Sequence, residues 1–183
     1  MSRRPSIIVG VLVLVVLMAG MVGAQAVYSQ YAAPEQPVKF THVTHAGVLQ
    51  MDCTFCHRNV DTGASAMVPA VEQCMFCHKA VTGDGTDPAK LAEIAKVRDA
   101  FDSGNPIDWI RVHRLPDTVR FVHSAHIKAL SKPGMPTAQV CSTCHGDVPS
   151  MGKVGQVRSL KMGDCVACHR QNSAPTDCTT CHK

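Results

Sequence analysis

Ten cysteines and five histidines of this 183-residue chain fall into five copies of one short motif, Cys-x-x-Cys-His. Two thiols and an imidazole at this spacing are typical of c-type haem attachment, in which the sulfurs bond to the porphyrin and the histidine becomes the proximal ligand of iron. No cysteine lies outside the motifs. The sequence therefore predicts five covalently bound haem c groups. In chain order, the first to fifth motifs contain Cys53, Cys56 and His57; Cys74, Cys77 and His78; Cys141, Cys144 and His145; Cys165, Cys168 and His169; and Cys178, Cys181 and His182.

Zinc sites and disulfides are the alternative uses of paired cysteines. A structural zinc ion takes four Cys or His ligands, whereas a disulfide or a redox dithiol needs only two cysteines. None of these requires a histidine directly after the second cysteine. Since histidine makes up only 10 of the 183 residues, a histidine at this place in all five motifs favours haem.

The histidines outside the motifs also number five, which equals the number of irons that need a second axial ligand. We therefore expect five bis-histidine haems. Methionine is the rival distal ligand and would raise the reduction potential. The expected distal ligands are His42, His45, His113, His123 and His126, of which His113 alone stands outside a repeated pattern.

The pattern Phe-x-His-x-x-His occurs twice, at residues 40–45 and 121–126, shortly before the first and third motifs. This internal repeat predicts two related halves, about 38–79 and 119–183, joined by residues 80–118. On a helix, histidines three positions apart share one face. Because each iron has a single free axial position, each pair is expected to bind two different haems. Phe40 and Phe121 are expected to pack on a porphyrin or in the core.

The composition predicts a mainly α-helical fold with much irregular structure, built around its cofactors. Phe, Trp and Tyr make up 4% of the residues, so porphyrins must supply much of the core, and the polypeptide is not expected to fold without them. Asp87 and Pro88 are a helix-start signal. Residues 103–106 are a stop signal, which predicts one helix between them. Strand signals are few.

The N-terminal residues 7–24 form an unbroken run of apolar and small residues after Arg3 and Arg4. Extended to residue 27, this run spans about 31 Å as a helix, enough to cross a bilayer. It is either an uncleaved anchor or a signal peptide cleaved near residues 24–26. We expect an anchor over 1–27, a linker over 28–37 and a pentahaem domain over 38–183. The haem domain then lies on the periplasmic side of the plasma membrane.

The formal charge of +4 does not indicate nucleic-acid binding. Arg3 and Arg4 contribute two of these charges, the lysines are scattered, and ionised haem propionates offset the remainder.

Several stretches carry a resemblance to one family. They resemble the pentahaem cytochrome c subunit of alternative complex III, a quinol:electron-acceptor oxidoreductase, and are similar to class III multihaem cytochromes c. The resemblance covers nearly everything from Val38 onward. Residues 131–139 look like an insertion, and any longer tail that the family has after the fifth motif is absent from this sequence. The stretches are residues 40–47, 52–57, 74–79, 103–117, 121–126, 141–146 and 162–170.

The resemblance implies an electron-transfer subunit with an N-terminal membrane helix and no catalytic residues of its own. Quinol would be oxidised in a neighbouring membrane subunit, and electrons would arrive through an iron–sulfur subunit. They would leave to a periplasmic cytochrome, copper protein or oxidase. The alternatives are a freestanding periplasmic electron shuttle and a multihaem reductase, which needs an iron with an open axial position.

Overall fold

The computed structural model describes residues 4–31, 33–83 and 85–183, with the side chains of 4–8 and 25–31 outside the description. Arg3 of the predicted anchor, Ala32 of the predicted linker and Asp84 lie outside the described residues. The chain divides into two compact units, Met1–Ala32 and Ala33–Lys183. We call the second the main unit.

The first unit is a single long helix, α1 (Arg4–Tyr31). Its described side chains, those of residues 9–24, are all exposed. Within the described part of the chain, no helix combines the length and the apolar character that crossing a membrane requires. The helix continues through residues 28–31, where we expected an extended linker, so that part of the linker prediction is wrong. Residues 33–37 contain no helix or strand.

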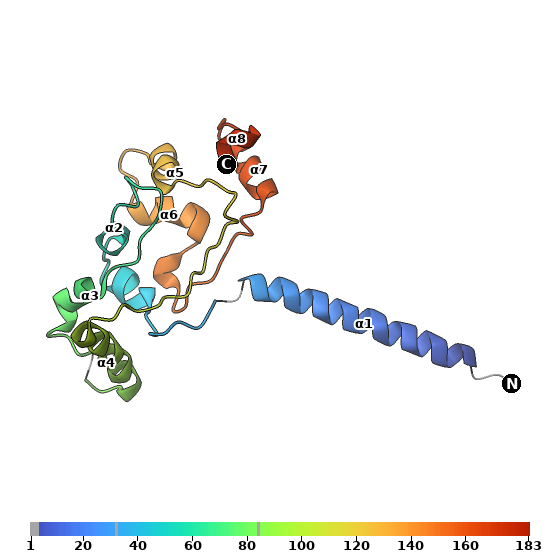
Figure 1. The fold of residues 1–183 in the computed structure, drawn as a ribbon, viewed down its shortest axis with the longest axis horizontal. Helices are drawn as coiled ribbons and strands as arrows, with labels where there is room; N and C mark the ends of the chain where they lie inside the picture. The colour runs from blue at the N-terminus through green and yellow to red at the C-terminus, as the bar shows by residue number, and fades with distance from the viewer. Residues whose placement is uncertain (1–3, 32, 84) are drawn as a thin grey trace. The chain divides into compact units, whose positions relative to one another are not determined.

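The main unit consists of short helices joined by irregular segments (Figure 1). The prediction of a mainly helical fold is confirmed, and the described residues contain no strand, only an isolated bridge between Val119 and His182. In chain order the elements are the π-helix η1 (Val43–Val48), α2 (Cys53–Cys56), α3 (Val71–His78), α4 (Pro88–Ser103), α5 (His123–Leu130), α6 (Thr137–His145), the 3₁₀ turn η2 (Val148–Ser150), α7 (Met162–Gln171) and α8 (Cys178–Cys181).

The predicted helix between residues 87 and 103 is confirmed as α4. The Asp87 carboxylate accepts a hydrogen bond from the Ala89 N–H, and Pro88 occupies the first turn. Gly104 ends the helix in the left-handed conformation, with φ of 69°. Both ends therefore follow the usual rules of helix capping.

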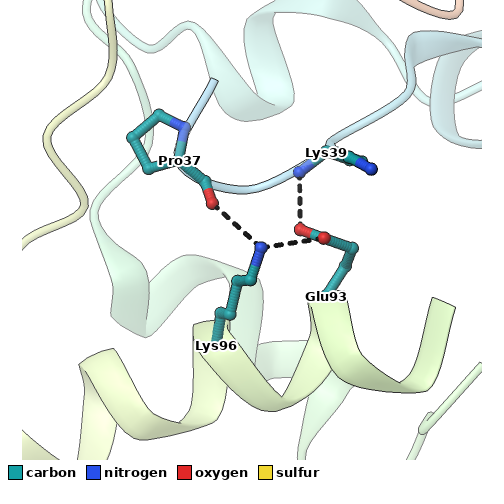
Figure 2. A network of polar contacts seen from close by, with 4 residues as sticks. All are labelled: Pro37, Lys39, Glu93 and Lys96. Carbon is teal, nitrogen blue, oxygen red and sulfur yellow. Dashed lines mark hydrogen bonds and ion pairs between the residues drawn. The ribbon is translucent and has the colours of Figure 1, made fainter. Parts of the chain in front are cut away.

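Helix α4 also holds the segment that leads into the first Phe-x-His-x-x-His repeat (Figure 2). The Glu93 carboxylate accepts hydrogen bonds from the Lys39 backbone N–H and the Lys96 ammonium group, both at 2.8 Å. Lys96 also donates to the Pro37 carbonyl at 3.3 Å. Earlier in the same segment, the Gln36 side chain donates to the carbonyl of Ile110 and accepts from its N–H. These contacts fix the start of the main unit.

The apolar core is very small for a chain of this length. The largest cluster joins Val38, Val71, Met75 and Val97, and Trp109 packs against it, in keeping with a structural role. Six hydrophobic residues in all are buried among those described. Meanwhile large apolar side chains inside the motifs, such as Phe55 and Phe76, are exposed. A unit with so little buried protein surface depends on something else to complete its core.

Candidate haem-binding sites

Each motif forms a helical turn or the end of a helix. Residues three and four positions apart lie on one helix face, so this spacing favours placing both sulfurs and the imidazole on one side where the turn is helical. Asp52 and Asp177 cap the two shortest motif helices by accepting hydrogen bonds from the backbone N–H groups of Thr54 and Thr180. All ten thiols are free, and eight of them are partly buried.

Six imidazole rings are oriented in one particular way, with Nδ1 close enough to donate to a backbone carbonyl oxygen. A donor bond from Nδ1 fixes the tautomer and leaves Nε2 unprotonated, as iron ligation requires. Neither the motif spacing nor the repeat predicted these acceptors. The pairs are His45 with Thr41, His57 with Met67, His78 with Val81, His123 with Ala64, His126 with Val122 and His169 with Pro175, at 2.5–3.0 Å.

Three histidines from the repeats face motif histidines across a nearly constant gap. An iron between two imidazoles holds the ring centres about 6 Å apart, from two metal–nitrogen bonds of about 2.0–2.1 Å plus the distance from each nitrogen to its ring centre. The observed separations match this requirement, so the residues present fit a bis-histidine iron. They are 6.1 Å for His45 and His78, 6.4 Å for His123 and His145, and 5.9 Å for His126 and His169.

His42 lies beside the remaining motif histidine of the first half. Burial, then the nearby charges of His57 and His45, lowers the pKa of His42 to about 4. His42 therefore stays neutral at physiological pH, which is the form that binds a metal. In the repeat His42 corresponds to His123, and each would then serve the motif that follows it directly.

The two repeats also share their aromatic packing. Phe40 stacks on His45, with ring centres 4.5 Å apart and planes at 24°. Phe121 stacks on His126, at 4.3 Å and again 24°. The phenylalanines thus contact the expected distal ligands directly, a contact that we had not foreseen.

His113 does not follow this pattern. Its ring centre lies 4.4 Å from that of His145, at 89° to it, and its Nε2 is 3.3 Å from the His145 Nδ1. Burial lowers the pKa of His113, and the charge of His123 adds to the effect. Among the described residues, His182 makes no ring contact, and its backbone pairs with Val119. The structure therefore brings three of the five expected distal ligands to motif histidines at this spacing and places His42 near His57, whereas His113 contacts His145 in a different way.

Contacts between motifs show which ones are neighbours in the first half. The Gln73 side chain, beside the second motif, donates to the Phe55 carbonyl in the first motif. The first and third motifs are also adjacent, because a hydrogen bond with the Cys141 thiol lowers the pKa of Cys53 to about 7. Since thioether formation removes the thiol protons, this interaction matters here as a sign of which sulfurs lie close together.

The remaining motifs follow in chain order. Burial raises the pKa of Cys144, with a smaller contribution from Cys168 in the fourth motif. Burial likewise raises the pKa of Cys165, and Cys181 in the fifth motif adds to the shift. Within the main unit, Figure 1 shows α3 and α4 at one end and α7 and α8 at the other, with α2 and α6 between them. The spatial order of the motifs is thus second, first, third, fourth, fifth.

One cation outside the motifs fixes a motif histidine through its backbone. The Arg98 guanidinium in α4 donates to the His78 carbonyl at 2.9 and 2.6 Å, and to the Lys79 carbonyl at 3.2 Å. It therefore satisfies the carbonyl groups at the end of α3. A lone arginine on a predicted helix gave no signal for this role.

No three Cys, His, Asp or Glu side chains within the described residues are arranged to hold a metal ion by themselves. The zinc alternative needs such an arrangement. A haem iron instead takes four of its ligands from the porphyrin and needs only two from the protein, which is what the histidine pairs offer.

Comparisons with known proteins support the interpretation of these motifs as haem-binding sites. The class III cytochrome c family matches residues 20–103, a stretch that includes the first repeat and the first two motifs. The menaquinone reductase multihaem cytochrome c subunit of Nitratidesulfovibrio vulgaris is 28% identical over 175 residues, which cover 84% of this chain and 79% of that protein. Both comparisons are with cytochromes c, and they support electron transfer by covalently bound haem c.

Proposed function

We propose that this chain carries five c-type haems and transfers electrons between a quinone-linked membrane complex and a periplasmic redox partner. The proposal depends above all on the pairing of repeat and motif histidines at about 6 Å, which recurs in both halves. Bound haem supplies reversible one-electron chemistry at iron, and axial ligands and their surroundings tune its potential.

In this proposal the residues of the chain attach and orient the cofactors. The ten motif cysteines form the thioether bonds, and the five motif histidines are the proximal ligands. The backbone carbonyl groups behind the imidazoles hold the rings in place. Four histidines of the repeats are distal ligands: His42 pairs with His57, His45 with His78, His123 with His145, and His126 with His169.

The spatial order of the motifs supports a single path with two ends. The second motif, beside α4, is at one end, and the fifth motif, in α8, is at the other (Figure 1). Each end is adjacent to only one other motif in the contacts described above. We propose that one end faces the membrane complex and that the other faces the periplasmic partner.

We also propose that α1 is a single-pass anchor in the plasma membrane, with the haem domain on the periplasmic side. The apolar run of residues 7–24 supports this, because it is helical throughout and its described side chains are exposed. Arg3 and Arg4 would lie on the cytoplasmic side.

The direction of electron flow has two candidates. The resemblance to alternative complex III implies quinol oxidation, with an iron–sulfur subunit before this chain and a cytochrome, copper protein or oxidase after it. The relative from Nitratidesulfovibrio vulgaris is a menaquinone reductase subunit, which favours the opposite direction. In both cases the partners are quinone-linked subunits on one side and a periplasmic redox protein on the other.

The test is to purify the chain from its native membranes in mild detergent. Intact-mass measurement should show five haems per chain, and iron–sulfur and quinone-binding subunits should copurify. Anaerobic addition of menaquinol, or of a reduced periplasmic cytochrome, then shows which one reduces the haems. Fewer than five haems would contradict the proposal, and a chain without membrane partners would indicate a freestanding shuttle.

A further inference from the structure

The Nδ1 atom of His145 has a different neighbour from the Nδ1 atoms of the other motif histidines whose contacts are described. His57, His78 and His169 each have Nδ1 on a backbone carbonyl. The Nδ1 of His145 instead faces the Nε2 of His113 at 3.3 Å. A side chain thus stands where the chain elsewhere uses a backbone group.

His113 cannot be the second axial ligand of the iron that His145 binds. Their ring centres are 4.4 Å apart, whereas the three matching pairs are 5.9–6.4 Å apart. The distal place is taken by His123, whose ring is 6.4 Å from that of His145 and within 9° of parallel to it. His113 therefore lies behind the ligand, on the side away from the iron.

The described ring contact of His113 is with the third motif. The residues that follow it, 118–120, meet the fifth motif through backbone hydrogen bonds. The Arg120 N–H donates to the Cys181 carbonyl at 2.6 Å, and the Lys183 N–H donates to the Thr118 carbonyl. Equal numbers of spare histidines and irons therefore do not translate into five equivalent pairs.

We propose that His113 is a positioning residue that accepts a hydrogen bond from the Nδ1–H of His145, and that it is not an axial ligand. This rests on the proposed function, because His145 must bind haem iron. Acceptance at Nε2 places the proton of His113 on its own Nδ1. An acceptor behind a ligating imidazole fixes the ring and raises its basicity, which lowers the reduction potential of the iron.

A consequence follows for the fifth motif. Five histidines are proximal ligands, four are distal ligands and His113 is the acceptor, so all ten are assigned. The iron at His182 would then have no second histidine ligand from this chain.

The test uses the full-length, haem-loaded protein in detergent, with His113→Leu and His113→Gln. Electron paramagnetic resonance measures the low-spin fraction, and a spectroscopic redox titration gives the potentials. His113→Leu should keep the wild-type low-spin fraction and shift one potential upward. His113→Gln retains a polar acceptor, so its potential should lie close to the wild-type value. The positive control is His123→Leu, which should convert one haem to the high-spin form.

Two results would overturn the inference. Loss of one low-spin haem in His113→Leu would make His113 an axial ligand, and an unchanged set of potentials would show that it does not act on His145. If His113→Leu does not accumulate, the low-spin fraction of His113→Gln decides, since Gln does not replace His as a strong axial ligand. Fewer than five haems in the wild-type protein would contradict the proposed function itself, so the two failures are distinguishable.

Discussion

Phe121 stacks on His126 with ring centres 4.3 Å apart and planes at 24°. A hydrogen bond holds the edge of the same imidazole, because its Nδ1 lies 2.8 Å from the Val122 carbonyl oxygen. Contacts from the protein therefore hold both the face and the edge of this ring. The same arrangement in Phe40 and His45 shows that the Phe in Phe-x-His-x-x-His orients the second histidine.

We predict that Phe121→Leu loosens one distal ligand without loss of haem. An aromatic pair contributes about 1 kcal/mol beyond its buried area, so the population with His126 off the iron should rise about fivefold. Carbon monoxide binding to the reduced protein measures this population. Leu49→Ala, at an exposed apolar residue outside the repeats and the motifs, is the control. Equal carbon monoxide binding by both variants would contradict the orienting role.

His45→Met and His126→Met are each expected to raise one reduction potential, and not the same one. Methionine is a weaker donor to ferric iron than imidazole and raises the potential of a c-type haem. The haems affected should be those attached at His78 and His169, because these rings face the substituted ones. Redox titration of each variant checks this. Thr44→Met adds the same side chain at an exposed neighbouring position and should leave all potentials unchanged.

Local signals in the sequence predicted the residues that can bind haem, and the structure supports their placement. Asp87, Pro88 and Gly104 predicted the bounds of α4 because capping depends on a few adjacent residues. The repeat predicted that paired histidines would serve different irons, and His45 and His42 do lie beside different motifs.

Long-range contacts were not predictable in the same way. Backbone carbonyls such as that of Met67 hold the imidazoles. Because every residue has a carbonyl group, the residue type does not indicate which one will be the acceptor. The spatial order places the first motif between the second and the third, because Cys53 and Cys141 meet across 88 positions of the chain. The count of spare histidines likewise said nothing about where the ring of His113 would lie.

The contact between Glu93 and the segment before the first repeat should make the protein less stable in acid. A hydrogen bond from Lys96, followed by one from the Lys39 N–H, lowers the pKa of Glu93 below its usual 4.5. A carboxyl group with a lowered pKa in the folded state stabilises the fold above its unfolded-state pKa, and this stability is lost as pH falls through the folded-state value.

Glu93→Gln should therefore reduce the free energy of unfolding by about 0.5–1 kcal/mol at pH 7. The difference from the wild-type protein should shrink as pH falls below 4.5 and disappear once pH is below the lowered pKa. Denaturant unfolding of the haem-loaded protein at pH 7 and at a pH well below 4.5 measures both effects. Asp99→Asn, at an exposed carboxylate on the same helix, is the control. An equal loss at both pH values would show that the charge of Glu93 is not what matters.

Gly146, directly after His145, should not tolerate a side chain. Its φ of 72° and ψ of −168° lie in a region that only glycine occupies readily. A Cβ would also approach Val157 Cγ1 to 3.0 Å and Met151 Cε to 3.1 Å. We expect Gly146→Ala to reduce the free energy of unfolding by about 1–3 kcal/mol.

Because the strain acts next to a proximal ligand, the same variant should also disturb one haem. The low-spin signal and potential assigned to His145 should change while the other haems keep theirs, and redox titration combined with thermal unfolding measures both. Gly152→Ala is the matched control, since a Cβ there meets nothing within 4 Å. Equal stability of the two variants would show that residues 146–157 relax around the added methyl group, and that the backbone at Gly146 does not constrain the third motif.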